Sequence, residues 1–456
     1  MPDSFKLVDS LACPRCDRTP LETGADGVRC GGCRIDFPYV GGIPWLFAEP
    51  TATLGEWRGR LHFSLQKLEH EHGRLLAAQA RAASSNLTRG RLERLAAATR
   101  DHAARLEALL APLAIELSTA SYETYLALRT RLPADQGLTT YYDNVHRDWV
   151  WGDEENDAAH AIVNEALQEM PPGKLLVLGA GAGRLAYDLH ERNRPLMTVM
   201  LDFNPLLLTV AQQVTRGAAL ELYEFPLAPI DLEHQAVLST LRAPAPARKG
   251  LHCVLADAHR PPFAKSSFDT VITPWLIDIL PEPFEVFCGR VNALLAPEGR
   301  WINFGSLSFH ASDPALRYSR DECVDIVAQT GFAAPRVAER VIPYMCSPAS
   351  RHGRRERIFC FAATKRANAG KVPRHEALPD WLVRGREPVP QLDSFRTQAA
   401  ATRIHAFIMS LIDGRRSLGD MAQVLADQKL MTREEAEPAI RSFLAKMYEE
   451  SRRGGY

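Results

Sequence analysis

The chain has 456 residues, with 54 Lys and Arg against 55 Asp and Glu, so its formal net charge is −1. This balance disfavours a strongly basic nucleic-acid-binding protein and a polybasic membrane-surface protein. Hydrophobic residues make up 46% of a chain long enough for two to four domains, and we find neither a run of about 18 apolar residues nor a secretory signal. We therefore expect a globular cytoplasmic protein with no membrane partner.

Four of the nine cysteines lie near the N-terminus as two C-x-x-C pairs, Cys13 with Cys16 and Cys30 with Cys33. Two such pairs place four thiolates around one ion, the tetrahedral sulfur site that zinc prefers, with iron as the alternative. Protein fills all four positions, so the site is expected to be structural. The segment resembles Trm112-like zinc ribbons, and we predict a ribbon over residues 1–50.

Residues 54–172 show helical spacing of apolar positions, which predicts two or three amphipathic helices with a break near 83–86. Short apolar runs then alternate with helical stretches over 173–366, which indicates an α/β fold with a parallel sheet. We expect strands at 175–179, 198–201, 252–257, 268–275 and 299–307. A Pro- and Arg-rich linker over about 366–395 precedes a small helical domain at 396–450.

A glycine-rich turn follows the first expected strand and contains Gly179, Gly181 and Gly183. A dinucleotide fingerprint requires its third glycine one residue later, where this chain has Arg184. The observed spacing is instead that of methyltransferases that bind S-adenosylmethionine. Asp202 ends the next strand, where an acid can accept both ribose hydroxyls, and Asp257 follows a later strand, where it could meet the adenine amino group. A turn that serves only helix–strand packing is the alternative.

Further motifs occur in a fixed order: RDW at 147–149, GAGAGRLA at 179–186, LDFN at 201–204, WLIDIL at 275–280 and RWINFGSLSFH at 300–310. In this order they resemble the carnosine N-methyltransferase, or N2227-like, family over about 140–365. The resemblance implies a Rossmann-like class I methyltransferase sheet. It also implies that the cofactor S-adenosyl-L-methionine is lined by Asn144, Arg147, Gly179, Gly181, Gly183, Asp202, Asp257 and Ala258, with Asn144 and Arg147 at its methionine end.

The resemblance further implies that Asp278 and His310 are catalytic and hold an imidazole acceptor. A carboxylate that accepts one imidazole N–H fixes the tautomer and aims the other nitrogen at the methyl group. Asp278 could instead cap a helix, and His310 could be a satisfied histidine at a strand end. Tyrosines of the family would fall near 354–357, where this chain has arginines. We therefore assign Tyr344 and Arg355 to substrate binding, which would suit an acidic or carboxylate-bearing acceptor.

The last predicted domain contains the pattern SLGDMA, in which Ser417 and Asp420 can cap a helix. Its sequence is weakly similar to PqqD-like winged-helix modules that bind peptides. Peptide or protein recognition and a plain scaffold or dimer contact both remain open for this domain, and its mixed charge disfavours DNA.

Together these patterns predict an N-methyltransferase that acts on an imidazole or similar nitrogen of a small peptide, a metabolite or a protein histidine. An RNA methyltransferase is the second interpretation, because related zinc ribbons occur beside such enzymes, although the overall charge gives no support for nucleic acid. The third is a non-catalytic adaptor that binds the cofactor and recruits partners.

Overall fold

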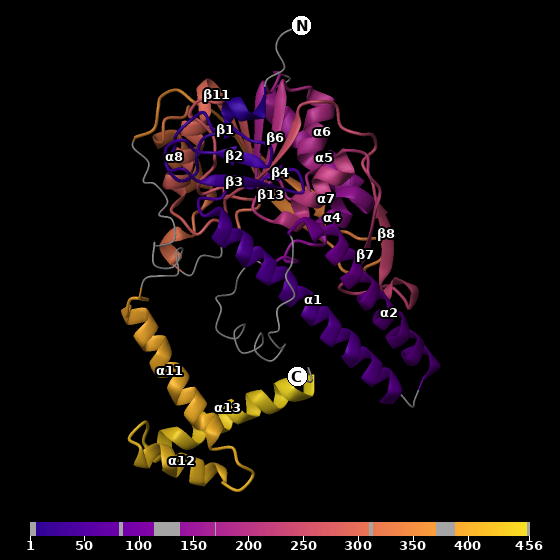
Figure 1. The fold of residues 1–456 in the computed structure, drawn as a ribbon, viewed down its shortest axis with the longest axis vertical. Helices are drawn as coiled ribbons and strands as arrows, with labels where there is room; N and C mark the ends of the chain where they lie inside the picture. Colours follow the sequence, from indigo (N-terminus) through magenta and orange to yellow (C-terminus); the bar gives the residue numbers. More distant parts are fainter. Residues whose placement is uncertain are drawn as a thin grey trace. The chain divides into compact units, whose positions relative to one another are not determined.

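The computed structural model describes residues 6–81, 85–113, 137–168, 170–309, 313–370 and 388–453. The chain divides into two compact units, residues 1–377 and 378–456, each of which is described by itself. Figure 1 labels the helices and strands.

A seven-stranded sheet forms the centre of the first unit. Its spatial order is β12 (Arg336–Tyr344), β13 (Arg354–Thr364), β11 (Leu295–Gly305), β10 (Phe268–Pro274), β5 (Lys174–Leu178), β6 (Met197–Asp202) and β9 (Leu251–Leu255). All neighbouring pairs from β11 to β9 are parallel, whereas β13 is antiparallel to both of its neighbours. The chain order reverses between β5 and β10, where ligands bind in open parallel sheets. The predicted Rossmann-like methyltransferase fold is confirmed.

Helices cover both faces of the sheet because its strands are apolar on both sides, as in β6, where all six residues are buried. One face packs against α5 (Asp153–Leu167), α6 (Arg184–Asn193) and α7 (Pro205–Thr215). The other packs against α8 (Phe284–Leu294) and α9 (Arg320–Gln329). Local sequence sets the helix starts: Asn204 accepts a hydrogen bond from Leu206 N, and Pro205 is the first residue of α7.

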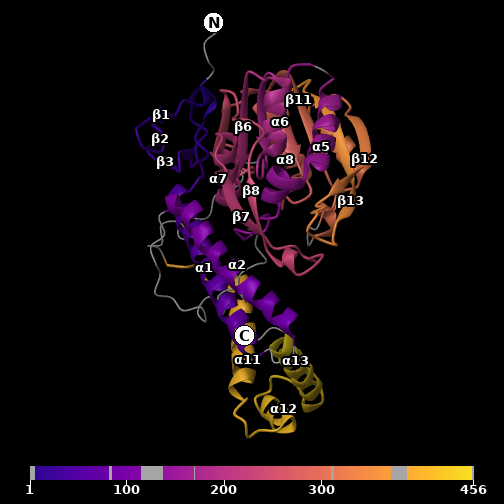
Figure 2. The same ribbon diagram turned by 90° about the vertical axis from the view of Figure 1, so that its right-hand side faces the viewer.

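Residues 7–47 form a small antiparallel module with a short helix at Leu7–Ser10 and strands β1 (Glu22–Thr23), β2 (Gly27–Arg29), β3 (Asp36–Val40) and β4 (Ile43–Pro44). We call it the ribbon. It packs beside the central sheet (Figure 2) and shares a core with it. No helix lies in the described connection between β9 and β10, and there the ribbon covers the sheet. Leu46 N donates to Leu255 O at 2.7 Å, and Leu11 forms a β-bridge with Phe263.

Two long helices, α1 (Pro50–Arg81) and α2 (Asn86–Leu109), form a hairpin that extends away from the sheet (Figure 1). The predicted break near 83–86 is found, with Ser85 capping α2. A 3-10 turn, Ala111–Leu113, follows. Further along, α4 (Asn144–His146) leads directly into a π-helical segment, η3 (Arg147–Trp151).

Several elements of the first unit were not predicted. A hairpin of β7 (Leu220–Glu224) and β8 (Val237–Leu241) is inserted between α7 and β9, with a 3-10 turn at Glu233–Gln235. The last two strands of the large sheet, β12 and β13, were also missed, as was a 3-10 turn at Pro314–Leu316.

The second unit contains α11 (Asp393–Ser410), α12 (Leu418–Asp427) and α13 (Arg433–Arg453). The predicted helix cap is present, because Ser417 and Asp420 form a reciprocal capping box at α12. No strand occurs among residues 388–453, so this part lacks the wing of a winged helix. Peptide recognition by this unit stays a prediction. Within the described residues, no helix combines the length and apolar character needed to cross a membrane.

Candidate active site

One cavity lies at the carboxyl ends of the parallel strands, beside the point where the strand order reverses. Residues from separate predicted motifs line it: Asn144, Arg147, Gly179, Gly181, Asp202, Ala258, Asp278 and Tyr344. Gly183, Asp257 and Arg355 do not line it, and His310 lies outside the described residues. The fold thus brings most of the predicted site together from segments more than 100 residues apart.

The glycine-rich turn and Asp202 are bonded to each other within this cavity. Gly181 N donates to one Asp202 carboxylate oxygen at 2.8 Å, and Asn204 N donates to the other at 2.9 Å. Burial raises the pKa of Asp202, while these backbone donors act in the opposite direction. Gly181 has a φ of +57° and no atom within 4 Å of the place where a Cβ would stand, so the backbone is open to a ligand there.

The structure gives Gly183 and Asp257 surroundings other than the cavity. A Cβ on Gly183 would lie 2.9 Å from Ala211 Cβ and 3.0 Å from Met200 Sδ, so this glycine allows α6 to pack closely on β6 and α7. Asp257 accepts hydrogen bonds from the backbone and ring nitrogens of His259, both at 2.8 Å. Its neighbour Ala258 takes the place at the cavity wall.

Arg147 begins the π-helical segment and lies between two acids. Its guanidinium donates to Asp148 at 2.8 Å and to Glu155 at 3.3 Å. Glu155 in turn accepts from Met345 N at 2.8 Å, so it connects this arginine to the residue after Tyr344. Burial lowers the pKa of Arg147, but the two carboxylates outweigh it and the net shift is upward. Arg147 is therefore a fixed, charged group at the cavity wall.

Asp278 is 4% exposed. One of its carboxylate oxygens accepts two hydrogen bonds, and the other accepts none from the described residues. Its Oδ2 accepts from Ser306 Oγ at 2.5 Å and from Ser308 N at 2.8 Å. Its Oδ1 is buried and has no hydrogen-bond partner among the described residues. A buried oxygen without a partner costs free energy, and such groups in folded proteins usually have a functional reason. Asp278 is thus prepared to accept a hydrogen bond from a ligand in the cavity.

Aromatic rings form the cavity wall near Asp278. The rings of Trp275 and Tyr344 lie 4.7 Å apart, and Phe304 lies 5.7 Å from Trp275 at right angles. Trp275 has a φ of +50°, an uncommon backbone conformation for a bulky residue. A Cβ on Gly305 would be 2.8 Å from the Trp275 backbone, so the adjacent strand end needs a glycine for this conformation to fit.

The structure does not bring together Tyr344 and Arg355, the two residues predicted to bind the substrate. Tyr344 lies directly opposite Arg354 in the β12–β13 pair, and Arg355 lies opposite Pro343. Neighbours along a strand point to opposite faces, so Arg355 faces away from Tyr344. The guanidinium of Arg354 stacks on the Tyr344 ring, 4.5 Å from its centre.

Other cavity residues were not assigned a role from the sequence, among them Tyr141, Asp148, Glu155, Trp275 and Ser306. Three of them, Asp148, Trp275 and Ser306, fall in the quoted motifs, and Tyr141 lies outside them. Glu155 carries no signal in the sequence, because an acid in the first turn of a helix is commonplace.

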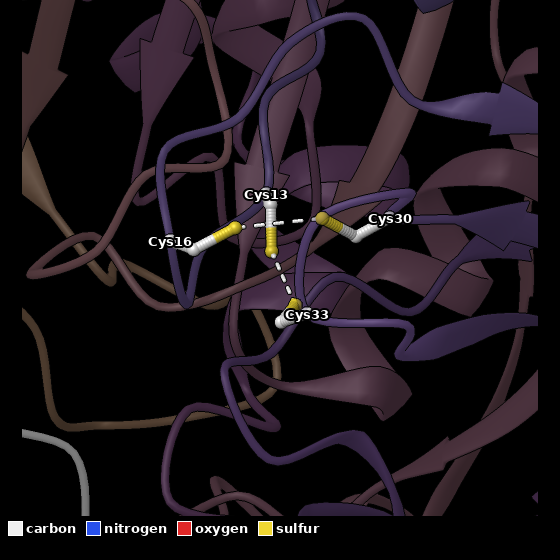
Figure 3. Close-up of side chains that lie close together, drawn as sticks. All are labelled: Cys13, Cys16, Cys30 and Cys33. Atoms are coloured by element: carbon white, nitrogen blue, oxygen red, sulfur yellow. Dashed lines mark hydrogen bonds between the residues drawn. The ribbon is translucent and has the colours of Figure 1, made fainter.

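The four N-terminal cysteines of the ribbon converge on one point (Figure 3). Cys13 Sγ lies 3.5 Å from Cys33 Sγ, Cys16 Sγ lies 3.4 Å from Cys30 Sγ, and all four sulfurs are within 4.8 Å of one another. Zinc–sulfur bonds of about 2.3 Å in a tetrahedron place sulfurs about 3.8 Å apart. The cluster therefore fits one tetrahedral metal ion.

The fold and the cavity define an S-adenosylmethionine-dependent methyltransferase. Residues 135–352, a little under half of the chain, match the model of the carnosine N-methyltransferase family. No curated protein matches the chain.

The chain is weakly similar to solved structures, several of which are described as methyltransferases. The YcgJ protein from Bacillus subtilis is 12% identical, with a TM-score of 0.33, over 46% of this chain and 99% of that one. A complex of the Haloferax volcanii Trm112 methyltransferase activator with a methyltransferase is 13% identical, with a TM-score of 0.33, over 50% of this chain and 96% of that one. Phosphoethanolamine N-methyltransferase 2 from Haemonchus contortus is 15% identical, with a TM-score of 0.34, over 56% of this chain and 62% of that one.

Proposed function

We propose that this enzyme methylates an imidazole or similar nitrogen of a small peptide, a metabolite or a protein histidine. The observation that carries the proposal is the buried Oδ1 of Asp278 in the cavity wall, which has no hydrogen-bond partner among the residues that the structure describes. An oxygen in this position accepts an N–H and leaves the opposite ring nitrogen with its lone pair directed away from the carboxylate. The match of residues 135–352 to the carnosine N-methyltransferase family model supports this chemistry.

The bound cofactor supplies a methyl group activated by its sulfonium charge. Asp202 would accept the ribose hydroxyls, because a carboxylate that already has two backbone donors still has lone pairs for further ones. Arg147 would bind the cofactor carboxylate, held in orientation by Asp148 and Glu155. Asn144, Gly179 and Ala258 complete this wall.

A neutral ring nitrogen becomes part of a cation when it receives a methyl group. Asp278 then faces a positive ring, so its charge favours the transition state over the neutral reactant. Ser306 and Ser308 keep the carboxylate in place during this change. His310, outside the described residues, stays a predicted second contact to the acceptor that could take its proton.

The acceptor class is tested by incubating the purified protein with methyl-labelled cofactor and carnosine, histidine, histidine-containing peptides or transfer RNA. We expect label on an imidazole nitrogen. Label in RNA and in no imidazole compound would contradict the proposal. Cofactor binding without label in any acceptor would support the adaptor interpretation instead.

The role of Asp278 is tested by Asp278→Ala. Loss of acceptor alignment should lower kcat about 100-fold, while the Kd of the cofactor measured by calorimetry changes less than about threefold. Asp321→Ala is the control, because the Asp321 side chain is 83% exposed and outside the cavity. Equal loss of cofactor affinity and turnover in Asp278→Ala would show that this residue serves the cofactor.

We also propose that the four ribbon cysteines bind one structural zinc ion. The support is the cluster of four sulfurs in two C-x-x-C turns, a donor set that zinc prefers. Since all four donors come from the protein, the ion would have no open position for substrate.

A further inference from the structure

A groove separate from the active-site cavity runs along the outer margin of β9, between the ribbon and α7. Its floor is the amino half of β9, residues 251–253, and its walls include Tyr39 of the ribbon and Thr215, the last residue of α7. The ribbon pairs with the carboxyl end of the same strand, where Leu46 N donates to Leu255 O at 2.7 Å. The groove is therefore the part of this margin that the ribbon leaves uncovered.

The backbone at the floor of the groove has hydrogen-bonding groups without a strand partner. Gly250 faces β6, because its O accepts from Thr198 N at 2.8 Å, and Leu255 faces outward to the ribbon. Since the direction of the backbone groups alternates along a strand, Leu251 and Cys253 face outward like Leu255. Among the residues that the structure describes, their N–H and C=O groups have no backbone partner at this margin. An extended peptide can pair with such groups as an added strand.

Positive charge surrounds this part of the margin. The described residues that line the groove include Arg216, Arg248 and Lys249 and no acid. Arg248 has a structural role, because it donates to two backbone carbonyl oxygens at 2.9 Å. Arg216 and Lys249 are exposed and form no ion pair within the described part of the chain. Burial raises the pKa of the Cys253 thiol to about 12, and the charge of Arg216 acts in the opposite direction, so this cation lies near the strand.

We propose that the groove binds an acidic peptide segment of a partner protein, which adds as a short strand beside the amino half of β9 with its carboxylates near Arg216 and Lys249. Both donors and acceptors line the margin, which favours a peptide backbone over a nucleic acid, whose phosphates only accept hydrogen bonds. The two unpaired cations favour acidic side chains. Arg216 and Lys249 do not line the active-site cavity, so the inference does not depend on the reaction proposed above.

The test measures binding of fluorescein-labelled hexapeptides to the full-length, zinc-loaded protein by fluorescence anisotropy. The probe alternates glutamate with valine. One derivative has lysine in place of glutamate, and a second has every amide nitrogen methylated, which keeps the charge and removes the strand hydrogen bonds. We expect the acidic probe to bind at least about tenfold more tightly than either derivative. Its affinity should fall about fivefold when sodium chloride is raised from about 50 to about 300 mM.

A double substitution, Arg216→Gln with Lys249→Gln, tests the two cations. It should weaken binding of the acidic probe at least about fivefold, while the Kd of S-adenosylhomocysteine stays within twofold and shows that the fold is intact. Arg91→Gln with Lys265→Gln is the matched control, because it removes the same charge from two exposed residues outside the groove. The control should change neither affinity by more than twofold.

Hydrogen exchange locates the bound probe. The acidic peptide should slow exchange of the Leu251 and Cys253 amides and leave that of Val341 in β12 unchanged. The inference is overturned if the protein does not bind the acidic probe, if either derivative binds as tightly, or if the two double variants act alike. Binding of polyuridylic acid that depends on Arg216 and Lys249, without binding of the acidic probe, would assign the groove to nucleic acid instead.

Discussion

Two aspartates at the carboxyl edge of the sheet differ in how their oxygens are occupied. Asp202 has a backbone donor on each oxygen, whereas Asp278 has two donors on Oδ2 and none, among the described residues, on Oδ1. Backbone donors on both oxygens keep the Asp202 carboxylate in one orientation, ready for a ligand that binds in every turnover. The arrangement at Asp278 leaves one acceptor whose hydrogen bond is completed only by a ligand. The same residue type thus fits two different tasks through its backbone surroundings.

Two glycines of the cofactor turn should respond differently to alanine. Gly181→Ala would place a methyl group in open cavity space at a φ of +57°, so we expect a loss of about 1–2 kcal/mol in stability and at least a tenfold loss of cofactor affinity. Gly183→Ala would place it 2.9 Å from Ala211 Cβ, so we expect the larger stability loss, about 3 kcal/mol. Denaturation and calorimetry measure the two effects. The reverse order of stability losses would contradict this distinction.

The sequence predicted the identity of the cavity residues better than their orientation. Arg147, Asp202 and Asp278 occur in the quoted motifs, and the last two of them end or follow a strand. The strand face on which Arg355 lies could not be predicted, because it depends on the register of β12 and β13, two strands that were not predicted. A shift of one residue on a strand exchanges the two faces.

Among the elements, the π-helical segment η3 positions Arg147 by docking on the glycine-rich turn. Trp149 Nε1 donates to Ala182 O at 2.8 Å. Arg184, the first residue of α6, donates through Nη1 to Asp148 O at 2.7 Å and through Nε to Asp188 at 2.9 Å. The methionine end of the predicted cofactor site is therefore attached to the same helix that begins after the glycines.

Arg184→Met tests this attachment. The substitution leaves the buried Asp188 carboxylate without its main cation, so we expect a loss of about 3–5 kcal/mol in the free energy of unfolding, measured by urea denaturation. Arg192→Met on the same helix is the control, since the Arg192 side chain is 44% exposed, pairs with the exposed Asp157 at 2.8 Å and reaches Asp188 only at 3.7 Å. It should cost less than about 1 kcal/mol. Equal losses in both variants would show that the Arg184 contacts contribute little.

Strands of the parallel part of the sheet could be predicted because they are continuous apolar runs between turn residues. β12 and β13 could not, because their outer halves, such as Arg354–Arg357, are charged and exposed and resemble a surface loop. The β7–β8 hairpin is an insertion with mixed burial and no strong alternation. Such elements are stabilised by pairing with distant segments, which a local pattern does not reveal.

At the scale of the first unit, the ribbon and the sheet share one hydrophobic core. Leu11, Val28 and Phe37 of the ribbon are buried in the same cluster as Leu178 and Val254 of the sheet. Backbone hydrogen bonds join Ala12 N to Pro262 O and Ala264 N to Ser10 O, both at 2.9 Å. The cysteine pattern predicted that the four thiols lie together but contained no information about this packing.

Removal of the metal should therefore destabilise more than the ribbon. We expect a chelator to lower the melting temperature of the protein by at least about 5 °C and to speed amide hydrogen exchange in β9 and residues 256–264. Exchange in β12, far from the ribbon in the strand order, should change little. Zinc added back should restore both quantities. Stoichiometric loss of metal with an unchanged melting temperature would show that the cysteines do not support the core.

The two margins of the central sheet differ in their capacity to recruit another strand. At β9 the backbone of Trp45 and Leu46 already pairs with the carboxyl end, whereas among the described residues β12 pairs only with β13. Edge-to-edge association between copies would then use β12 on each side, in an isologous contact that closes at two molecules. Because the ribbon pairs with the carboxyl end of β9, that margin offers fewer free backbone groups to a second copy than β12 does.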